Sequence, residues 1–477
     1  MRSKRVGPAL AVLFLVNVLN FYDRQALGAI LEPLRHEFSL SDTQLGGLVT
    51  LFTVVFALAG MPLGKLADTR PRRGLLAIGI AVWTGLTGLA GAASSYAMLL
   101  ATRLGVGIGE AVCTPAATSW IGDLVPPERR ARAMAAFMTA VPVGVMLSLA
   151  ISGPVAQAYG WRAALMLAAA PGLLLVPAVL WLREPERGIP DGGREGEAKV
   201  SAPDPGEAAV AWDRGHGDSL CSHLRMRDLP QPEQVETLGG GGTGTGRVGR
   251  GKVGRGKVGR RNRLSYNAAS FSTQFWWIAV SGAVVNFALY AFSTFLPALL
   301  TRYHGLSVKE AGIWTGVGSG ISGILGAAAA GLLGDRVRNR LWLAAAAAGL
   351  AALPIFAGIH MPAGQAGVAV ALAMAGYGLL QMYYGLVYAA IQDIVAPGMR
   401  GRAMASYFLV TYLGGASWGP LVTGRLSDWF AHRSGLAAEA SRAAGLHQAM
   451  YVIPVLALVL AGVLWQAGRP TGSPRAA

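Results

Sequence analysis

The sequence is poor in charge and in cysteine. Only 14% of its 477 residues are Asp, Glu, Lys or Arg, whereas soluble domains contain roughly 25%. A soluble chain of this length would need far more polar surface. The two cysteines form no CxxC motif and no His/Cys metal spacing, which argues against structural disulfides and against zinc. With 53% hydrophobic residues, the sequence predicts a polytopic membrane protein.

Motifs of several enzyme classes are missing as well. No GxxxxGK[ST] phosphate loop occurs, so an ATP-driven pump would lack its nucleotide cradle, and HExxH is also absent. No metal or cofactor is implied. We therefore expect a protein that is not an enzyme. A receptor or scaffold that kept a transporter fold is an alternative, because the chain carries a long basic segment.

Apolar runs long enough to cross a bilayer recur along the chain, since a span needs roughly 20 mostly apolar residues. The first run is too long for a signal peptide and ends in DRQ, so we interpret it as a retained span. We expect an all-α membrane protein with twelve transmembrane helices. Their predicted ranges are 7–30, 44–66, 74–94, 97–120, 132–156, 161–182, 272–300, 310–334, 341–359, 365–391, 403–426 and 447–467.

Basic residues alternate between successive connections. They precede span 1 and lie between spans 2 and 3, 4 and 5, 8 and 9, and 10 and 11, whereas the 3–4 and 9–10 connections have none. By the positive-inside rule both termini are cytoplasmic. The net charge of +16 then belongs to one membrane face, and a nucleic-acid partner is not expected. The abundance of Ala, Gly and Arg indicates a GC-rich bacterial gene, and hence an inner membrane.

The two halves of the chain resemble each other. GKLADTRPRR (64–73) matches GLLGDRVRNR (331–340), and RARAMA (130–135) matches RGRAMA (400–405). Repeats of six spans are typical of transporters built from two related bundles. We therefore predict two pseudo-symmetric six-helix bundles, residues 1–182 and 269–477.

A polar segment, residues 183–268, separates the halves. It contains GGGGTGTG and then a five-residue basic repeat, VGRGKVGRGKVGR. Low hydrophobicity and high glycine content predict disorder. Two interpretations are open: a passive tether between the bundles, or a basic cytoplasmic segment that contacts anionic lipids.

The first span contains polar residues, in the stretch NVLNFYDRQ. A charge in the middle of a spanning helix costs roughly 2.5–3.5 kcal/mol on insertion scales, and such residues face a bundle interior or water. Asn17, Asn20 and Arg24 share one helix face, and Asp23 lies beside that face. A polar stripe along span 1 is predicted.

Span 4 supplies a second charged pair. Arg103 and Glu110 are seven residues apart and share a face, with Gly107 between them. Counted from the outer ends, Glu110 and Asp23 lie at similar depths. We therefore predict a buried cluster of Asp23, Arg24, Arg103 and Glu110 facing one cavity. The cluster is either a charge-neutral structural lock or, as we favour, a site that loads and releases a proton and binds substrate.

The second half offers weaker candidates. Span 7 places Asn286 and Tyr290 on one face, and span 10 does the same with Gln381, Tyr384 and Tyr388. Polar-aromatic faces suit an amphiphile, because tyrosine combines an apolar body with a polar tip. Ordinary interhelical packing explains them equally well. We expect these residues, together with Asn20, to contribute to substrate binding.

The loop motif GKLADTRPRR and the span-4 motif RLGVGIGEA (103–111) resemble signatures of the major facilitator superfamily, G-x-L-x-D-R-x-G-R-R and its fourth-helix counterpart. The resemblance implies a cytoplasmic gate formed by the loop motif and its second copy. Thr69 and Pro71 depart from the family pattern, so we expect a weaker latch. The residues implied for this gate are Gly64, Asp68, Arg72, Arg73 and Asp335.

A narrower resemblance rests on FYDR (21–24), RLGVGIGEA, IGDLVPPERRARA (121–133) and AVPVG (140–144), which are similar to Spinster-like transporters. It implies proton-linked alternating-access transport of lysolipid-like amphiphiles, with membrane lipids, substrate and protons as partners of a monomer. The coupling residues implied are Asp23, Arg24, Arg103 and Glu110. The anion:cation symporter branch shares DR and GxGEA, so an organic-anion:proton symporter is the alternative.

Overall fold

The structure is a computed structural model that describes residues 3–185, 271–395 and 399–469. These residues form helices and connecting turns, with no strand among them. The described helices belong to one compact unit. Nearly all of the predicted tether, residues 183–268, lies outside the described residues.

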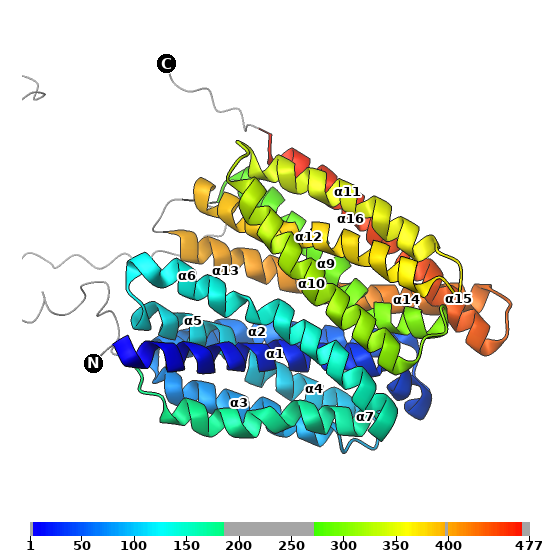
Figure 1. Ribbon diagram of the computed structural model, residues 1–477, viewed down its shortest axis with the longest axis horizontal. Coiled ribbons are helices and arrows are strands. Elements are labelled where there is room, and N and C mark those ends of the chain that lie inside the picture. Colours follow the sequence, from blue (N-terminus) through cyan, green and yellow to red (C-terminus); the bar gives the residue numbers. More distant parts are fainter. Residues whose placement is uncertain (1–2, 186–270, 396–398, 470–477) are drawn as a thin grey trace, which may run out of the picture. The chain divides into compact units, whose positions relative to one another are not determined.

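Seven helices form the first half, α1 (Ser3–Phe38), α2 (Asp42–Thr69), α3 (Arg72–Ala90), α4 (Tyr96–Glu110), α5 (Cys113–Leu124), α6 (Pro127–Met138) and α7 (Ala140–Trp181). The second half contains α9 (Thr273–Arg302), α10 (Val308–Gly334), α11 (Arg340–His360), α12 (Ala366–Ile394), α13 (Arg400–Thr411), the π-helical turn η4 (Tyr412–Ala416), α14 (Trp418–Arg433), α15 (Ala438–Met450) and α16 (Val452–Ala467). Figure 1 shows the two groups on either side of a common interface.

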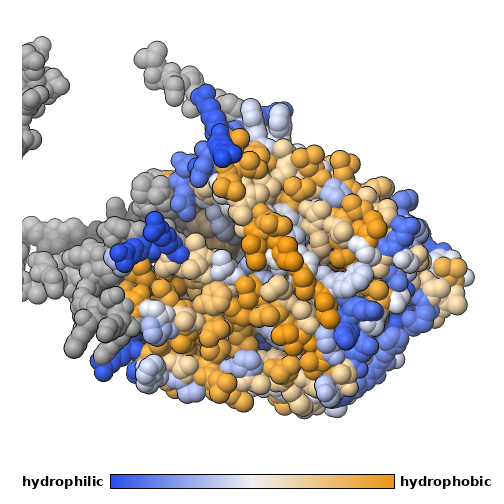
Figure 2. All heavy atoms as spheres, viewed as in Figure 1, coloured by the Kyte–Doolittle hydropathy of each residue, from blue (hydrophilic) through white to orange (hydrophobic). Residues whose placement is uncertain are grey.

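The all-helical membrane fold is confirmed. Ten helical stretches of the described residues are long and apolar enough to span a membrane. One of them, residues 132–181, contains two predicted spans that meet at Gly160, whose φ of 85° breaks the helix. Residues 400–433 supply the predicted eleventh span. Figure 2 shows an apolar belt around the middle of the molecule and hydrophilic residues toward its ends, as a lipid-embedded protein requires.

Capping boxes fix the starts of two equivalent helices. Ser41 accepts a hydrogen bond from the backbone N–H of Gln44, whose side chain accepts one from the Ser41 backbone N–H. Ser307 and Glu310 repeat this arrangement at the start of α10. Each box satisfies two backbone N–H groups that a helix N-terminus leaves unpaired. The second and eighth spans therefore begin in the same way, as expected of related halves.

The two halves meet mainly through three helix pairs, α1 with α9, α2 with α14 and α7 with α10. We call the end of the molecule where α1 begins the basic end, and the opposite end, which contains Asp42, the distal end. Glycines permit backbone contact across the interface: a Cβ on Gly312 would lie 2.6 Å from the Leu149 carbonyl oxygen, and one on Gly424 would overlap the Asp42 carbonyl. Small residues let helix backbones approach in lipid, so the halves are tightly closed here.

Adding one methyl group should loosen this closure. In Gly424→Ala the new Cβ would collide with the Asp42 carbonyl and push α14 away from α2. We expect spin labels on two exposed distal loops, at Ser94 and Ala363, to gain a longer-distance population in double electron–electron resonance. Gly60→Ala is the matched control, because a Cβ there meets nothing within 4 Å. Identical distance distributions for both variants would contradict the assigned role of the glycine contact.

Candidate functional site

An ion pair lies between α1 and α4 in the interior of the first half. The Arg24 Nε donates to the Glu110 carboxylate at 2.8 Å, and the two side chains are 4% and 0% exposed. A buried arginine–carboxylate hydrogen bond of this kind is charge-assisted and strong. The pair satisfies the requirement that a charge inside a membrane bundle has a partner.

Aromatic rings surround the Arg24 guanidinium. Its central carbon lies 3.9 Å from the ring centroid of Phe56, 5.0 Å from that of Phe21 and 5.9 Å from that of Phe52. Ring faces attract a cation within about 6 Å, so these rings hold the guanidinium in place. Its Nη2 is buried and has no hydrogen-bond partner. The ion pair with Glu110 thus leaves part of the donor capacity of Arg24 unused.

Asp23 belongs to a separate pair. Its carboxylate accepts a hydrogen bond from Thr87 Oγ1 of α3 at 2.6 Å and lies 3.8 Å from the Arg103 guanidinium. The Arg103 Nη2 also donates a hydrogen bond to Thr87 Oγ1 at 3.4 Å. The four predicted charges are therefore brought together as two pairs on neighbouring faces of α1, and the charges of the two pairs lie close enough to interact with one another. The charges form two pairs because Asp23 and Arg24 are about 100° apart on the helix.

The asparagines of the polar stripe are buried beside these pairs. Asn17 Nδ2 donates to the Phe137 carbonyl at 3.2 Å. Asn20 is 0% exposed, and neither atom of its amide has a partner. Gly107 serves helix packing, since a Cβ there would lie 2.9 Å from the Phe52 carbonyl oxygen. It brings α4 against α2 and thereby sets the position of Glu110.

The second half contributes an aromatic wall. Tyr384 donates to the Asn286 side-chain oxygen at 3.0 Å, and its ring lies 5.7 Å from that of Tyr388. Gln381 donates to the Tyr377 hydroxyl at 2.9 Å. Tyr290 is among the residues of both halves that line a small pocket beside Arg24. That pocket is formed by Arg24, Gln25, Gly28, Val49, Phe52, Tyr290, Ser293 and Thr294.

Sequence reasoning missed three members of this wall. The Tyr407 hydroxyl donates to that of Tyr383 at 3.1 Å, and Tyr383 is hydrogen-bonded to Ser281 at 2.8 Å. Tyr412 lies with its ring 5.6 Å from that of Phe56 in the other half. The two tyrosines in SYFLVTY (406–412) were the available signal, but their spacing does not show which face of the helix meets the interface.

The loop motif forms a buried network near the basic end. Arg72 is 0% exposed, and its guanidinium donates to Glu184, to Asp123 and to the Ser119 carbonyl. The backbone N–H groups of Arg72 and Arg73 also donate to Glu184. Burial raises the pKa of the Glu184 carboxyl, but these hydrogen bonds outweigh it and lower the pKa overall. This stabilisation is therefore present near neutral pH and is lost as acid protonates the carboxyl.

The other predicted gate residues are less engaged. The Gly64 Cβ position is 4.0 Å from Pro115, and the Asp68 side chain lies outside the described part. Asp335 is 86% exposed and 4.0 Å from Arg340, which pairs more closely with Asp393. The counterpart of Arg72 in the second copy is Asn339, whose side-chain oxygen caps the start of α11.

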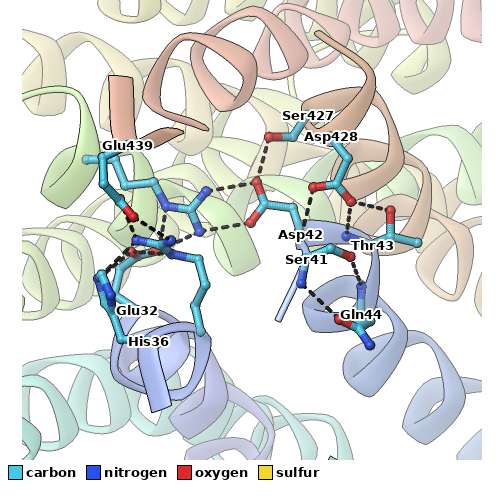
Figure 3. A network of polar contacts seen from close by, with 11 residues as sticks. Glu32, His36, Ser41, Asp42, Thr43, Gln44, Ser427, Asp428 and Glu439 are labelled. Atoms are coloured by element: carbon cyan, nitrogen blue, oxygen red, sulfur yellow. Dashed lines mark hydrogen bonds and ion pairs between the residues drawn. The ribbon is translucent and has the colours of Figure 1, made fainter. Parts of the chain in front are cut away.

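A network of ion pairs closes the distal end, and sequence reasoning did not find it (Figure 3). Arg302 of α9 donates to both oxygens of Asp42 at 2.8 Å and also to Glu32. Arg35 of α1 donates to Glu32 at 3.0 Å and to Glu439 at 2.9 Å. We call these five residues the distal network; Arg302 and Glu439 belong to the second half and the others to the first.

A helix cap supplied by the other half reinforces this closure. The carboxylate of Asp428, on α14, accepts hydrogen bonds from the backbone N–H groups of Asp42 and Thr43 at 3.0 and 2.9 Å (Figure 3). Acidic groups at a helix N-terminus are favoured by the helix dipole and by its unpaired N–H groups. Ser427 also donates to Asp42 at 2.6 Å. The start of α2 is thus bound by α14 as well as by its own capping box.

Comparisons with known proteins agree with this architecture. The family model described as Major Facilitator Superfamily matches residues 13–420. The chain is 28% identical over 431 residues to an MFS-type efflux pump of Mycolicibacterium smegmatis, covering 89% of this chain and 85% of that protein. It is 30% identical over 190 residues to Protein spinster of Drosophila melanogaster, covering 40% of this chain and 31% of that protein.

A solved structure has the same fold. It is a bacterial homologue of the human lysosomal transporter Spinster in an inward-facing, occupied conformation. The TM-score is 0.75 at 24% sequence identity, and the match covers 98% of each chain.

Removing the arginine of the distal network should open the distal end. Arg302→Gln leaves Asp42, with a side chain 4% exposed, as a buried charge without its ion-pair partner, and leaves Glu32, 7% exposed, paired with Arg35 instead of with two arginines. Breaking a buried pair in this way costs about 3–5 kcal/mol, and we expect the distal spin-label distance to lengthen. Arg162→Gln is the control, because its pair with Glu37 is exposed and lies within one half, where a pair is worth about 0–1 kcal/mol. Equal effects of the two substitutions would argue against the network as a closure.

Proposed function

The chain belongs to the Major Facilitator Superfamily and is a multi-pass membrane transporter, and on this premise we propose that it moves a small, lysolipid-like amphiphile by proton-coupled alternating access. The observation that carries the proposal is the buried Arg24–Glu110 pair with its unpartnered Nη2. The similarity to Protein spinster and to an efflux pump supports membrane transport. The similarity to a sphingosine-1-phosphate transporter of Danio rerio, 32% identical over 201 residues that cover 41% of this chain and 40% of that protein, supports this class of substrate.

Arg24 can respond to the protonation of Glu110 and can also bind the head group of the substrate. While Glu110 is ionised, it holds the Arg24 guanidinium through Nε. A proton on Glu110 removes this charge pairing and frees the guanidinium for an anionic head group. Conversely, a head group on Arg24 makes the ionised Glu110 costly to keep buried without its partner. Proton and substrate are thereby linked through one arginine.

The pocket beside Arg24 suits a polar head. Gln25, Tyr290, Ser293 and Thr294 line it together with Arg24 and offer amide and hydroxyl groups. The aromatic wall of Tyr384 and its neighbours offers apolar surface with polar tips, which suits the rest of an amphiphile. We assign Asn286 and Gln381 to this wall as hydrogen-bond partners that orient its tyrosines.

The closed distal end corresponds to one state of the cycle. We assign the basic end to the cytoplasm by the positive-inside rule, so the structure represents a conformation closed toward the outside. Opening the outer side would require the distal network and the Asp428 cap to break. We place the protein in a bacterial inner membrane, with the network on its outer face.

Neutralising Glu110 should abolish the coupling of transport to protons without abolishing substrate binding. Glu110→Gln keeps the shape of the side chain but cannot take up a proton. We expect proton-driven substrate accumulation in proteoliposomes to fall to the level of protein-free vesicles, while substrate exchange without a proton gradient persists. Glu37→Gln, which alters a 38% exposed carboxylate, should transport normally. Loss of folded Glu110→Gln protein would instead favour the structural-lock interpretation.

The substrate class can be tested through proton movement. Interior pH is followed in proteoliposomes while lysophospholipids and sphingoid amphiphiles, or sugar acids and aromatic acids, are added. We expect a proton flux with the lipids that is lost in Asp23→Asn, because Asp23 would no longer pair with Arg103. A response to the acids alone would overturn the amphiphile proposal. It would favour an organic-anion:proton symporter, since the unpaired Nη2 of Arg24 suits a carboxylate equally well.

A further inference from the structure

The eleventh span is interrupted by a π-helical turn. Residues Tyr412–Ala416 form this turn between α13 and α14. Its defining hydrogen bond runs from the Ser417 N–H to the Tyr412 carbonyl at 3.0 Å, and the Ser417 hydroxyl donates to the same oxygen at 2.8 Å. Single π-helical turns are rare and are often found at functional sites. Here a side chain adds a second bond to the turn and so holds it in place.

The turn is packed closely against α9. A Cβ on Gly415 would collide with the backbone of Ala283, and one on Gly414 would contact its side chain. Gly415 therefore lets the widened turn fit beside a neighbouring helix of the same half, whereas a Cβ on Gly414 would lie at an ordinary contact distance of 3.5 Å. The packing against α9 therefore fixes the position of the turn on this side.

Helix α2 of the other half contacts both ends of the turn. At one end the Tyr412 ring lies 5.6 Å from that of Phe56. At the other end Thr50 Oγ1 donates to the Ser417 carbonyl. Phe56 is also the ring closest to the Arg24 guanidinium, at 3.9 Å. The ring of Phe56 therefore lies between the turn and Arg24, the residue proposed to bind the head group.

The turn divides the span into two parts with different surroundings. Before it, α13 carries Tyr407 of the aromatic wall and Phe408, whose ring lies 5.9 Å from that of Tyr388. After it, α14 carries Gly424 and Asp428, which contact the start of α2 in the distal closure. A change in the hydrogen bonding of the turn would alter the direction of α14 relative to α13, as helix bends at π-bulges do.

We infer that Tyr412 is a positioning residue for transport, whose ring detects a ligand beside Arg24 and whose π-helical turn passes the displacement to α14 and the distal closure. An amphiphile whose head group binds Arg24 places the start of its apolar part against Phe56. The apolar part displaces the Tyr412 ring, and α14 then changes its direction relative to α13 at the π-helical turn. The ligand-sensing half of this inference rests on the proposed function; the hinge half does not.

The hinge half is tested first, without any ligand. In the Arg302→Gln background, where the distal end is expected to open, deletion of Gly414 converts the turn to regular α-helix. We expect the deletion to suppress the long-distance population between labels at Ser94 and Ala363. If the double variant opens as fully as Arg302→Gln alone, the π turn is not the hinge and the inference is overturned.

A second variant covers the case in which the deletion does not fold. Ser417→Ala removes the side-chain bond to the Tyr412 carbonyl but keeps the backbone bond. We expect it to increase the long-distance population in the otherwise unchanged protein. Thr423→Ala, a buried hydroxyl on α14 with no hydrogen-bond partner, is the control and should leave the distances unchanged. An unchanged distribution in Ser417→Ala would count against the hinge.

The ligand-sensing half is tested with lysophosphatidylglycerol as probe. We expect the probe to lengthen the distal distance in wild type and in Tyr412→Phe, which keeps the ring, but not in Tyr412→Ala. Probe binding measured by calorimetry should persist in Tyr412→Ala. A full response in Tyr412→Ala would overturn the role of the ring. If wild type neither binds nor responds to the probe, the proposed substrate class fails, whereas the hinge is still judged by the Gly414 deletion.

Discussion

A charge inside a lipid-embedded bundle requires a partner, and the placement of those partners governs this structure. Both central pairs, Arg24 with Glu110 and Asp23 with Arg103, lie within the first half. The halves can therefore separate without leaving either pair broken in a dry interior. The pairs that do cross between the halves, such as Arg302 with Asp42, lie at the distal end, where water replaces the lost partner on opening. In the proposed alternating-access cycle, the cost of an unpaired buried charge is thus avoided in both conformations.

This division explains the different chemistry of the two halves. The first half contains the paired charges, so the second half can face them with tyrosines and amides. The sequence repeat does not extend to these interiors. It does not make the loops equivalent either, since Arg72 is fully buried and paired with Asp123 and Glu184, whereas its counterpart Asn339 caps the start of α11. By the positive-inside rule, the basic residues of the motif predict the same membrane orientation for both halves. Side-chain burial differs because the neighbouring helices differ.

The helical membrane fold and the four central charges could be predicted from the sequence, because charge in an apolar run is costly and therefore conspicuous. Their pairing could not. It depends on Thr87 and on the rotation of α3 and α4, which one sequence does not specify. The distal network was missed because charges such as Asp42 and Arg302, at the ends of spans, look like ordinary loop residues. The π turn was missed because LGGA has no pattern that distinguishes it from an α-helix.

Alternating access, as proposed above, requires a reversible distal closure. This closure combines hydrogen bonds and ion pairs at the edge of the membrane with glycine contacts and with buried apolar side chains of both halves, such as Leu34 and Leu299, which belong to one cluster. Hydrogen bonds to charged groups contribute about 1.5–3 kcal/mol each in net terms. Inverting a two-state population from about 1:99 to 99:1 takes about 5.5 kcal/mol of differential binding, and micromolar binding supplies about 8 kcal/mol in total. Under the proposed function, a ligand that binds at Arg24 therefore has enough binding free energy to offset the loss of a few such polar contacts.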